Sequence, residues 1–156
     1  MQKKSSMKAG TFKIIENWEI KRVNRFTGEI IDVEEKCNTI VDNGLERAAN
    51  CLISGTYFRA IGIGTGTTGA TNSDTTLETE YTRSLATLAY EADYKATFSK
   101  TFEFGSGVSE DITEAGIFDS DTVSGSTMLA RTTFASKAIS ASIDLITTAT
   151  ITVARA

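Results

Sequence analysis

The sequence contains no histidine and no proline, and only two cysteines among its 156 residues. Without histidine there is no Ser-His-Asp or Cys-His catalytic arrangement, no histidine metal site and no imidazole that titrates near neutral pH. Two thiols alone do not make up a four-ligand zinc site. We therefore expect a protein that is not an enzyme and that has no catalytic residue, cofactor, metal site or small-molecule substrate.

The two cysteines, Cys37 and Cys51, match no CxxC pattern. We expect both to be reduced and to act as small apolar fillers, with a single Cys37–Cys51 bridge as the alternative. No apolar run reaches about 18 residues, so we expect no membrane-spanning segment. The N-terminal stretch MQKKSSMKAGTFKIIENW has charge but no apolar core, and we do not expect it to be a secretory signal. These features predict a protein made in a cytoplasm.

Charge is distributed unevenly along the chain. Residues 1–13 carry Lys3, Lys4, Lys8 and Lys13 and no acid, whereas residues 37–156 carry eight basic and fourteen acidic side chains. We divide the chain into a basic arm, residues 1–12, and a single body, residues 13–156. A basic arm on an acidic body predicts that these four lysines contact an acidic partner, such as a neighbouring protein or a second copy. The alternative is a frayed, solvated terminus, and the acidic body disfavours nucleic acid as the partner.

The body has the composition of a β-sheet protein. Of 24 threonines, 21 lie from residue 51 onward, and this β-branched residue suits a pleated surface. Alternating apolar residues predict a charged hairpin over 13–41, turning at Gly28, with Trp18 packed inside. Helical spacing predicts one short helix near 44–54, capped by Asp42 or Asn43, ended by Gly55 and packed on the sheet through Leu45, Ala48, Ala49, Leu52 and Ile53.

Several short runs with turn signals between them predict the remaining strands. They are residues 57–63, 81–90, 93–104, 112–119, 127–135 and 143–154. In the final run, Leu145, Thr147, Ala149, Ile151 and Val153 share one face, and Phe98, Phe102 and Phe104 alternate on another strand. Strands at this spacing predict an all-β fold with one short helix, arranged as a β-sandwich or barrel.

Two motifs suggest chemistry only weakly. Gly64-x-Gly66-x-x-Gly69 matches the GxGxxG pattern of dinucleotide-binding loops, but it is followed by ATNSDTT rather than by an apolar helix face. We expect a flexible connection between two strands. The acids Glu110, Asp111, Glu114, Asp119 and Asp121 lack the spacing of a calcium loop, and we expect a solvated turn.

Two longer segments resemble a pair that recurs in structural proteins of tailed bacteriophages. They are AIGIGTGTTGATNSDTTLETEYTR, residues 60–83, and SEDITEAGIFDSDTVSGSTMLARTTF, residues 109–134. In that group a strand ends in a Gly-Thr loop, a "T-x-x-D-T-x-L" stretch leads to an arginine strand, and "ITEAGLF" and "MLAR" follow. Here these elements are Thr71, Asp74, Thr75, Leu77 and Arg83, then Ile112 to Phe118, then Met128 to Arg131. Relatives often have a proline where this chain has Gly69-Ala70, so we expect a looser loop.

The resemblance implies a jelly-roll-like β-sandwich that serves as a virion building block, here preceded by the arm and the hairpin. It implies a capsid decoration protein that binds the shell exterior, contacts the major capsid protein, forms a homotrimer and stabilises the shell by bridging subunits. Such a protein would be synthesised in the host cytoplasm and would contact neither membrane nor nucleic acid. The alternative is a tail or head fibre module that binds a receptor, with Tyr57, Tyr81, Tyr90 and Tyr94 as its exposed aromatics.

The motif ITEAGIF also has a physical interpretation of its own. Glu114 interrupts an otherwise apolar strand, and Gly116 allows a close backbone approach. Arg83 or Arg131 is expected to pair with Glu114. The pair is either buried, where it sets the local geometry, or exposed, where it contributes less than about 1 kcal/mol.

Overall fold

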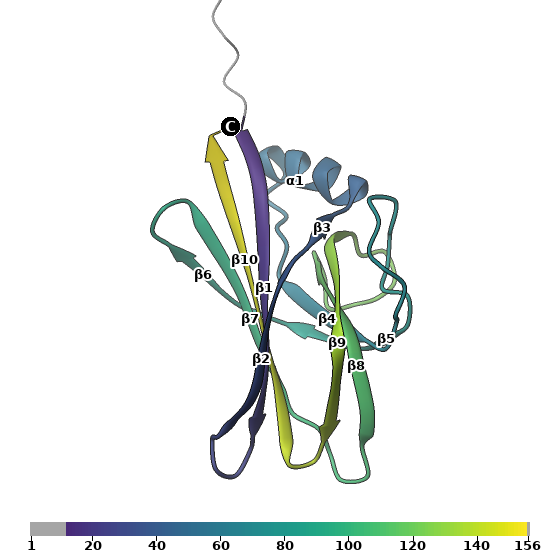
Figure 1. Ribbon diagram of the computed structural model, residues 1–156. Coiled ribbons are helices and arrows are strands. Elements are labelled where there is room, and N and C mark those ends of the chain that lie inside the picture. The colour runs from purple at the N-terminus through teal and green to yellow at the C-terminus, as the bar shows by residue number, and fades with distance from the viewer. Residues whose placement is uncertain (1–11, 156) are drawn as a thin grey trace, which may run out of the picture.

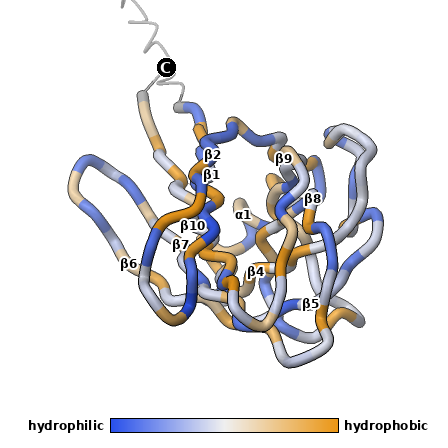
Figure 2. Tube along the Cα trace, turned by 60° about the horizontal axis from the view of Figure 1, so that its bottom comes forward, coloured by the Kyte–Doolittle hydropathy of each residue, from blue (hydrophilic) through white to orange (hydrophobic). Residues whose placement is uncertain are grey.

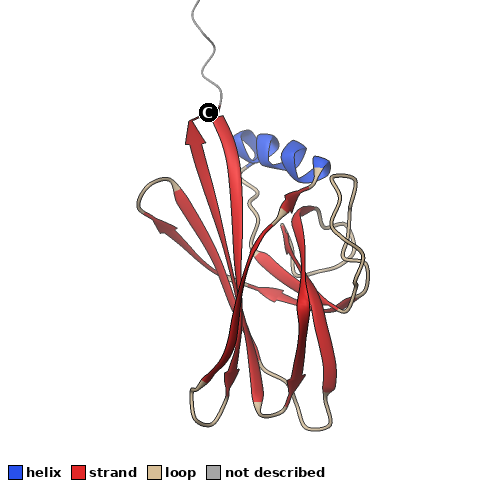
Figure 3. Cartoon of the chain, in the orientation of Figure 1, coloured by secondary structure: helices blue, strands red, loops and turns tan. Residues whose placement is uncertain are grey.

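The computed structural model describes residues 12–155, so Lys3, Lys4 and Lys8 lie outside the described residues. Within this range the chain forms ten strands and one helix (Figure 3). The elements are β1 (Phe12–Asn24), β2 (Ile30–Cys37), β3 (Thr39–Ile40), α1 (Asp42–Ser54), β4 (Ala60–Gly64), β5 (Glu80–Leu85), β6 (Thr87–Glu91), β7 (Lys95–Phe102), β8 (Ser109–Phe118), β9 (Met128–Ser140) and β10 (Ile143–Arg155). The predicted all-β fold with one helix is confirmed.

All strand pairs are antiparallel, and the strands form one continuous sheet that folds over on itself. The sheet bends between β9 and β10, which are joined by a single residue pair, Ser140–Ile143. One layer has the strand order β6-β7-β10-β1-β2, and the other has the order β5-β4-β8-β9-β3. The two layers face each other across the molecule (Figure 1). The jelly-roll topology stays a prediction.

The hydrophobic core lies between these layers (Figure 2). The first layer contributes Trp18 and Leu145, and the second contributes Ile61, Ile63 and Ile117, each at most 1% exposed. This arrangement follows from the period of two in the strands, because every second side chain faces the opposite layer. As predicted, Phe98, Phe102 and Phe104 all belong to the core, as do Leu145, Ala149 and Ile151 of β10, whereas Val153 is exposed.

The predicted hairpin is present but shorter than expected. β1 and β2 pair from Asn17–Cys37 to Val23–Ile30, and Gly28 adopts the positive φ of +72° that the turn requires. Residues 39–41 do not belong to it, because β3 crosses to the other layer and pairs with β9. β1 makes its longest pairing with β10, through thirteen residue pairs, so the hairpin is part of the first layer.

The helix begins earlier and faces differently than predicted. Its N-cap is Val41, with no side-chain hydrogen bond, so Asp42 and Asn43 lie in the first turn and do not cap it. Gly55 ends the helix with a φ of +68°, as predicted. α1 lies across one end of the sandwich (Figure 1) and is closest to the second layer at Gly44, where a Cβ would collide with the backbone of Leu129.

The expected contact of the helix with the sheet is therefore wrong for its largest side chains. Leu45, Leu52 and Ile53 are 45%, 86% and 89% exposed. The small side chains of Ala48 and Cys51 pack against the core instead. A helix at the end of two layers meets their rim, where only small residues allow a close approach.

The structure also answers the question of the cysteines. Both thiols are free, so the Cys37–Cys51 bridge is not formed. Cys51 packs partly against the core, but Cys37 is exposed and is not an apolar filler. Among the residues that the structure describes, no helix has the length and apolar character that crossing a membrane requires.

Candidate functional site: the buried Glu114–Arg131 cluster

A buried ion pair lies within the second segment of the resemblance, residues 109–134. Glu114 lies on β8 and its side chain is fully buried, and Arg131 lies on the neighbouring β9 with 3% of its side chain exposed. Arg131 Nε donates to Glu114 Oε2 over 2.8 Å. Of the two arginines that the sequence left open, Arg131 is therefore the partner, and the buried alternative applies.

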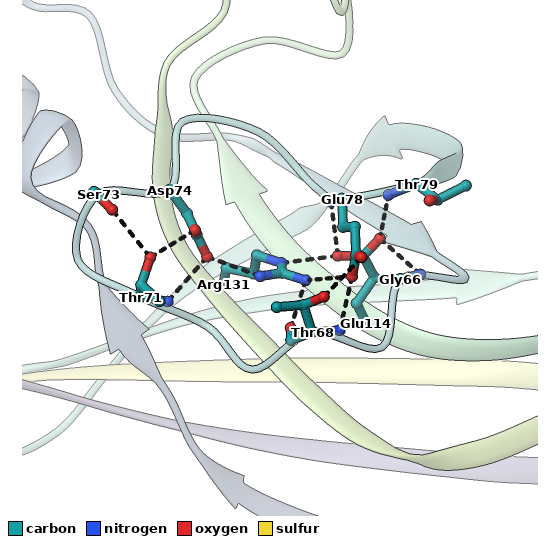
Figure 4. Close-up of polar contacts among 9 residues, drawn as sticks. All are labelled: Gly66, Thr68, Thr71, Ser73, Asp74, Glu78, Thr79, Glu114 and Arg131. Atoms are coloured by element: carbon teal, nitrogen blue, oxygen red, sulfur yellow. Dashed lines mark hydrogen bonds and ion pairs between the residues drawn. The ribbon is translucent and has the colours of Figure 1, made fainter.

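Every acceptor position of Glu114 is used (Figure 4). Oε1 accepts hydrogen bonds from the backbone N–H groups of Gly66 and Thr79, at 3.0 and 2.8 Å. Oε2 accepts from the backbone N–H of Glu78 at 3.0 Å, in addition to Arg131. Four charge-assisted hydrogen bonds offset the cost of burying the carboxylate. Glu114 thus binds the beginning and the end of the Gly-Thr loop, residues 65–79.

Arg131 binds the middle of the same loop. Its guanidinium donates to Asp74 Oδ2 at 2.8 Å and to the carbonyl oxygen of Thr68 at 2.9 Å, and it lies 3.5 Å from Glu78 Oε2. Asp74 in turn accepts from the N–H of Thr71 at 3.0 Å. The loop, which was expected to be a flexible connection, is therefore bonded to Glu114 and Arg131 at its beginning, middle and end.

The loop carboxylates are held in their ionised form. Burial opposes ionisation of Asp74, but hydrogen bonds from the Thr71 N–H and from Arg131 outweigh it and lower the pKa of Asp74. The backbone N–H and hydroxyl of Thr68 lower the pKa of Glu78. Burial acts to lower the pKa of Arg131, yet its bonds to Asp74 and Glu114 raise it above its ordinary value. Asp74, Glu78 and Arg131 are thus all charged at neutral pH.

The GxGxxG motif has a steric role here. A Cβ at Gly64 would collide with the carbonyl oxygen of Thr79, and one at Gly66 would lie 2.6 Å from Glu114 Oε1. Gly69 has open space around it. Two glycines therefore let the backbone approach Glu114. The Gly66 N–H, which a phosphate-binding loop would direct at its ligand, is bonded to this carboxylate.

Arg83, the other arginine of the motif, forms a second cluster. It makes a bidentate ion pair with Glu80 at 2.6 and 3.0 Å, and its guanidinium carbon lies 3.4 Å from the ring centroid of Phe118. It also donates to Ser126 Oγ at 2.5 Å. Both arginines thus connect loops to the second layer.

The predicted acidic turn does not form one site. Asp119 is buried and pairs with Arg47 at 3.0 Å, and its backbone and side chain both bond to Thr127. Glu110, Asp111 and Asp121 are exposed. Across residues 12–155, no three histidine, cysteine or acidic side chains gather in a way that could hold a metal ion.

The predicted partner-contact lysines are described in part. Lys13 is exposed at the start of β1, and the other three lie outside the described residues. Several large side chains are also exposed. They include Leu52 and Ile53 on α1, Tyr57 after it, and Tyr90 and Tyr94 near the β6–β7 turn, the last two at 76% and 72% exposure. The helical spacing predicted an apolar stripe on α1, but it could not show whether that stripe faces the sheet or solvent.

Comparisons of the chain with protein-family models, with curated proteins and with solved structures give no match in any of the three.

Proposed function

We propose that the chain is a virion structural protein that binds the outside of a capsid and stabilises it by bridging subunits. One observation carries the proposal. The two segments that resemble phage structural proteins, residues 60–83 and 109–134, form adjacent strands of one layer, β5-β4-β8-β9. The Glu114–Arg131 cluster ties them together. The resemblance thus corresponds to one physical unit, which is what a shared architecture predicts.

The surface at the helix end of the sandwich supports a role in assembly. The start of β1, which the basic arm precedes, lies at the same end as α1 (Figure 1). Leu52 and Ile53 are among the most exposed apolar side chains of the described residues. Exposed apolar side chains suit the centre of a protein–protein interface. The proposed partners are the major capsid protein and further copies of this chain in a trimer.

Reconstitution on capsids that lack the protein tests this proposal. The native protein is expected to bind such shells and to raise the temperature at which they disrupt. The double variant Leu52→Ser/Ile53→Ser is expected to bind at least tenfold more weakly while keeping its fold, because both side chains are exposed. Val33→Ser, an equally apolar-to-polar change on β2, is the control. Absence of native binding would contradict the proposal.

A fibre module that binds a receptor is the second candidate, and the exposed tyrosines favour it. Tyr57, Tyr90 and Tyr94 are each more than half exposed, as aromatic side chains in carbohydrate sites are before binding. A glycan array probed with the native protein and with Tyr90→Ala/Tyr94→Ala tests this role. Signals that the variant loses would support it, and an array without signals would oppose it.

A further inference from the structure

Two strand edges face each other on one side of the sandwich without pairing. Among the described residues, β2 pairs with β1 alone, and residues 132–139 of β9 pair with β8 alone. The edges of β2 and β9 lie next to each other (Figure 1), since backbone groups of β9 bond to side chains of β1 and β2. The closure of this side of the sandwich therefore depends on side chains and not on a backbone ladder.

Lys137 of β9 is the cation that closes this side. Its side chain is 6% exposed, and its ammonium group lies 2.9 Å from Glu34 Oε2 and 3.3 Å from Asp32 Oδ2, both on β2. Glu34 Oε1 also accepts the backbone N–H of Ala135, again on β9, at 3.3 Å. An ammonium group buried this deeply is costly unless it is paired, so the two carboxylates allow Lys137 to lie at the rim of the core. We call Asp32, Glu34 and Lys137 the clasp.

The clasp covers part of the apolar core. In the strand register, Glu34 lies opposite Ile20 of β1, and Lys137 lies opposite Ile112 of β8. Residues that pair across two strands share one face of the sheet, and both isoleucines are fully buried members of the core. The carboxylates and the methylene stem of Lys137 therefore separate these side chains from solvent. An apolar closure would do so at any pH, whereas this closure depends on ionised groups.

Positive charges surround the two acids of the clasp. Arg22 of β1 makes a bidentate ion pair with Asp32, at 2.8 and 3.1 Å. The ammonium group of Lys36 lies 3.2 Å from Glu34 Oε1. On β8, the exposed Asp111 is close enough to Arg22 for its charge to act on the guanidinium group. Protonation of both clasp acids would leave three cations next to one another, namely Arg22, Lys36 and Lys137.

The two clasp acids stay ionised well into the acid range. Hydrogen bonds from Arg22 and, against the effect of burial, from Lys137 lower the pKa of Asp32 below its ordinary value of 3.8. Burial opposes ionisation of Glu34, but hydrogen bonds from Lys137 and from the Ala135 N–H outweigh it and lower the pKa of Glu34 below 4.5. Acids with lowered pKa values stabilise the closed form fully above their ordinary values, and this contribution is lost as the pH falls through the lowered ones. The closed form therefore loses its support below about pH 4.

We propose that the clasp is an acid-sensitive closure of the sandwich. With Asp32 and Glu34 ionised, Lys137 holds the edge of the first layer on β9. When both acids are protonated, the remaining cations repel one another, β2 moves away from β9, and water reaches the core on this side. This inference stands independently of the proposed virion role.

Quenching of Trp18 fluorescence by acrylamide measures the opening. Trp18 is the one tryptophan of the sequence, is 1% exposed and lies opposite Lys36 of β2. In the native protein, quenching is expected to stay constant from pH 7 to about 5 and to rise severalfold below about 4, while circular dichroism still shows the sheet. Asp32→Asn/Glu34→Gln, which mimics the protonated clasp, should show the raised quenching already at pH 7. Glu35→Gln is the matched control, because Glu35 is exposed on the same strand, and it should behave like the native protein.

The single variants Asp32→Asn and Glu34→Gln each keep one acid beside Lys137 and should open at a higher pH than the native protein. They decide the question if the double variant does not fold. The proposal would be overturned by native quenching in the double variant at pH 7, or by single variants that open at the native pH. An acid-induced rise of the same size in the native protein and the double variant would place the response elsewhere in the molecule. Loss of the sheet signal at the same pH as the rise would show general unfolding and would equally overturn it.

Discussion

Arg131 is the side chain on which the order of the Gly-Thr loop depends, since it contacts both Glu114 and Asp74. We expect Arg131→Met to lower the free energy of unfolding by about 3–5 kcal/mol, because it leaves the buried Glu114 carboxylate without its cationic partner. Lys21→Met is the control, since the Lys21–Glu19 pair is partly exposed and contributes less than about 1 kcal/mol. Urea denaturation of both variants measures the difference. A similar loss of unfolding free energy in the two variants would show that the buried ion pair contributes no more to stability than the exposed one.

Acid should loosen the same loop. The pKa values of Asp74 and Glu78 lie below their ordinary values of 3.8 and 4.5. Their contribution to stability is therefore complete above those ordinary values and is lost as pH falls through the lowered ones. We expect the amide chemical shifts of Thr68 and Thr71, whose N–H groups bond to these carboxylates, to stay constant from pH 7 to about 5 and to move below about 4. In Asp74→Ala, the Thr71 amide should show its acid-form shift at every pH.

Within the loop, the glycines differ sharply in how much space they have. We expect Gly66→Ala to cost about 1–3 kcal/mol, because its Cβ would lie 2.5 Å from the Cβ of Glu78 and crowd Glu114. Gly69→Ala adds a methyl group in open space and should be neutral or stabilise the fold by up to about 1 kcal/mol. Thermal unfolding of the two variants gives the comparison. A loss at Gly69 as large as at Gly66 would contradict this account.

The strands followed from the sequence because a period of two is a local signal. Trp18, the three alternating phenylalanines and most of the β10 face lie inside as predicted. The face of α1 did not follow, because helical spacing shows that a stripe exists but not whether a sheet or only its rim lies beneath it. Leu52 and Ile53 were therefore placed inside, and they are exposed.

The sequence predicted the acidic residue of the candidate site, Glu114, but not the groups that donate hydrogen bonds to it. A glutamate in an apolar strand is visible in the sequence, and two arginines were available to pair with it. The choice of Arg131 depends on the alignment of β8 with β9, in which Gly116 lies opposite Arg131. The N–H groups of Gly66, Glu78 and Thr79 are backbone donors, which every residue type but proline carries, so no sequence signal marks them. The burial of Glu16 was not predicted, because its acid looked like one of many charges on a wet hairpin.

The whole molecule should refold without a slow isomerisation step. The sequence has no proline, so no X-Pro bond has to change isomer over tens of seconds. The first layer instead requires β1 to find β10 across the length of the chain, which predicts folding in milliseconds to seconds. Stopped-flow fluorescence of Trp18 should show no phase of tens of seconds, and a prolyl isomerase should change nothing. A slow phase at low protein concentration would contradict this expectation.

Because β1 and β10 pair over thirteen residues, the resistance of the protein to a pulling force should depend on the direction of that force. Because the strands are antiparallel, Phe12 lies opposite Arg155, at the same end of the ladder. A force that pulls these two residues apart opens the hydrogen bonds one pair at a time, like a zipper. A force on the arm that is resisted at the opposite end of the sandwich pulls β1 along its own axis and loads the ladder in shear, so that many pairs must break together. A molecule pulled between its arm and the opposite end of the sandwich should therefore withstand a much larger force than one pulled between Phe12 and Arg155.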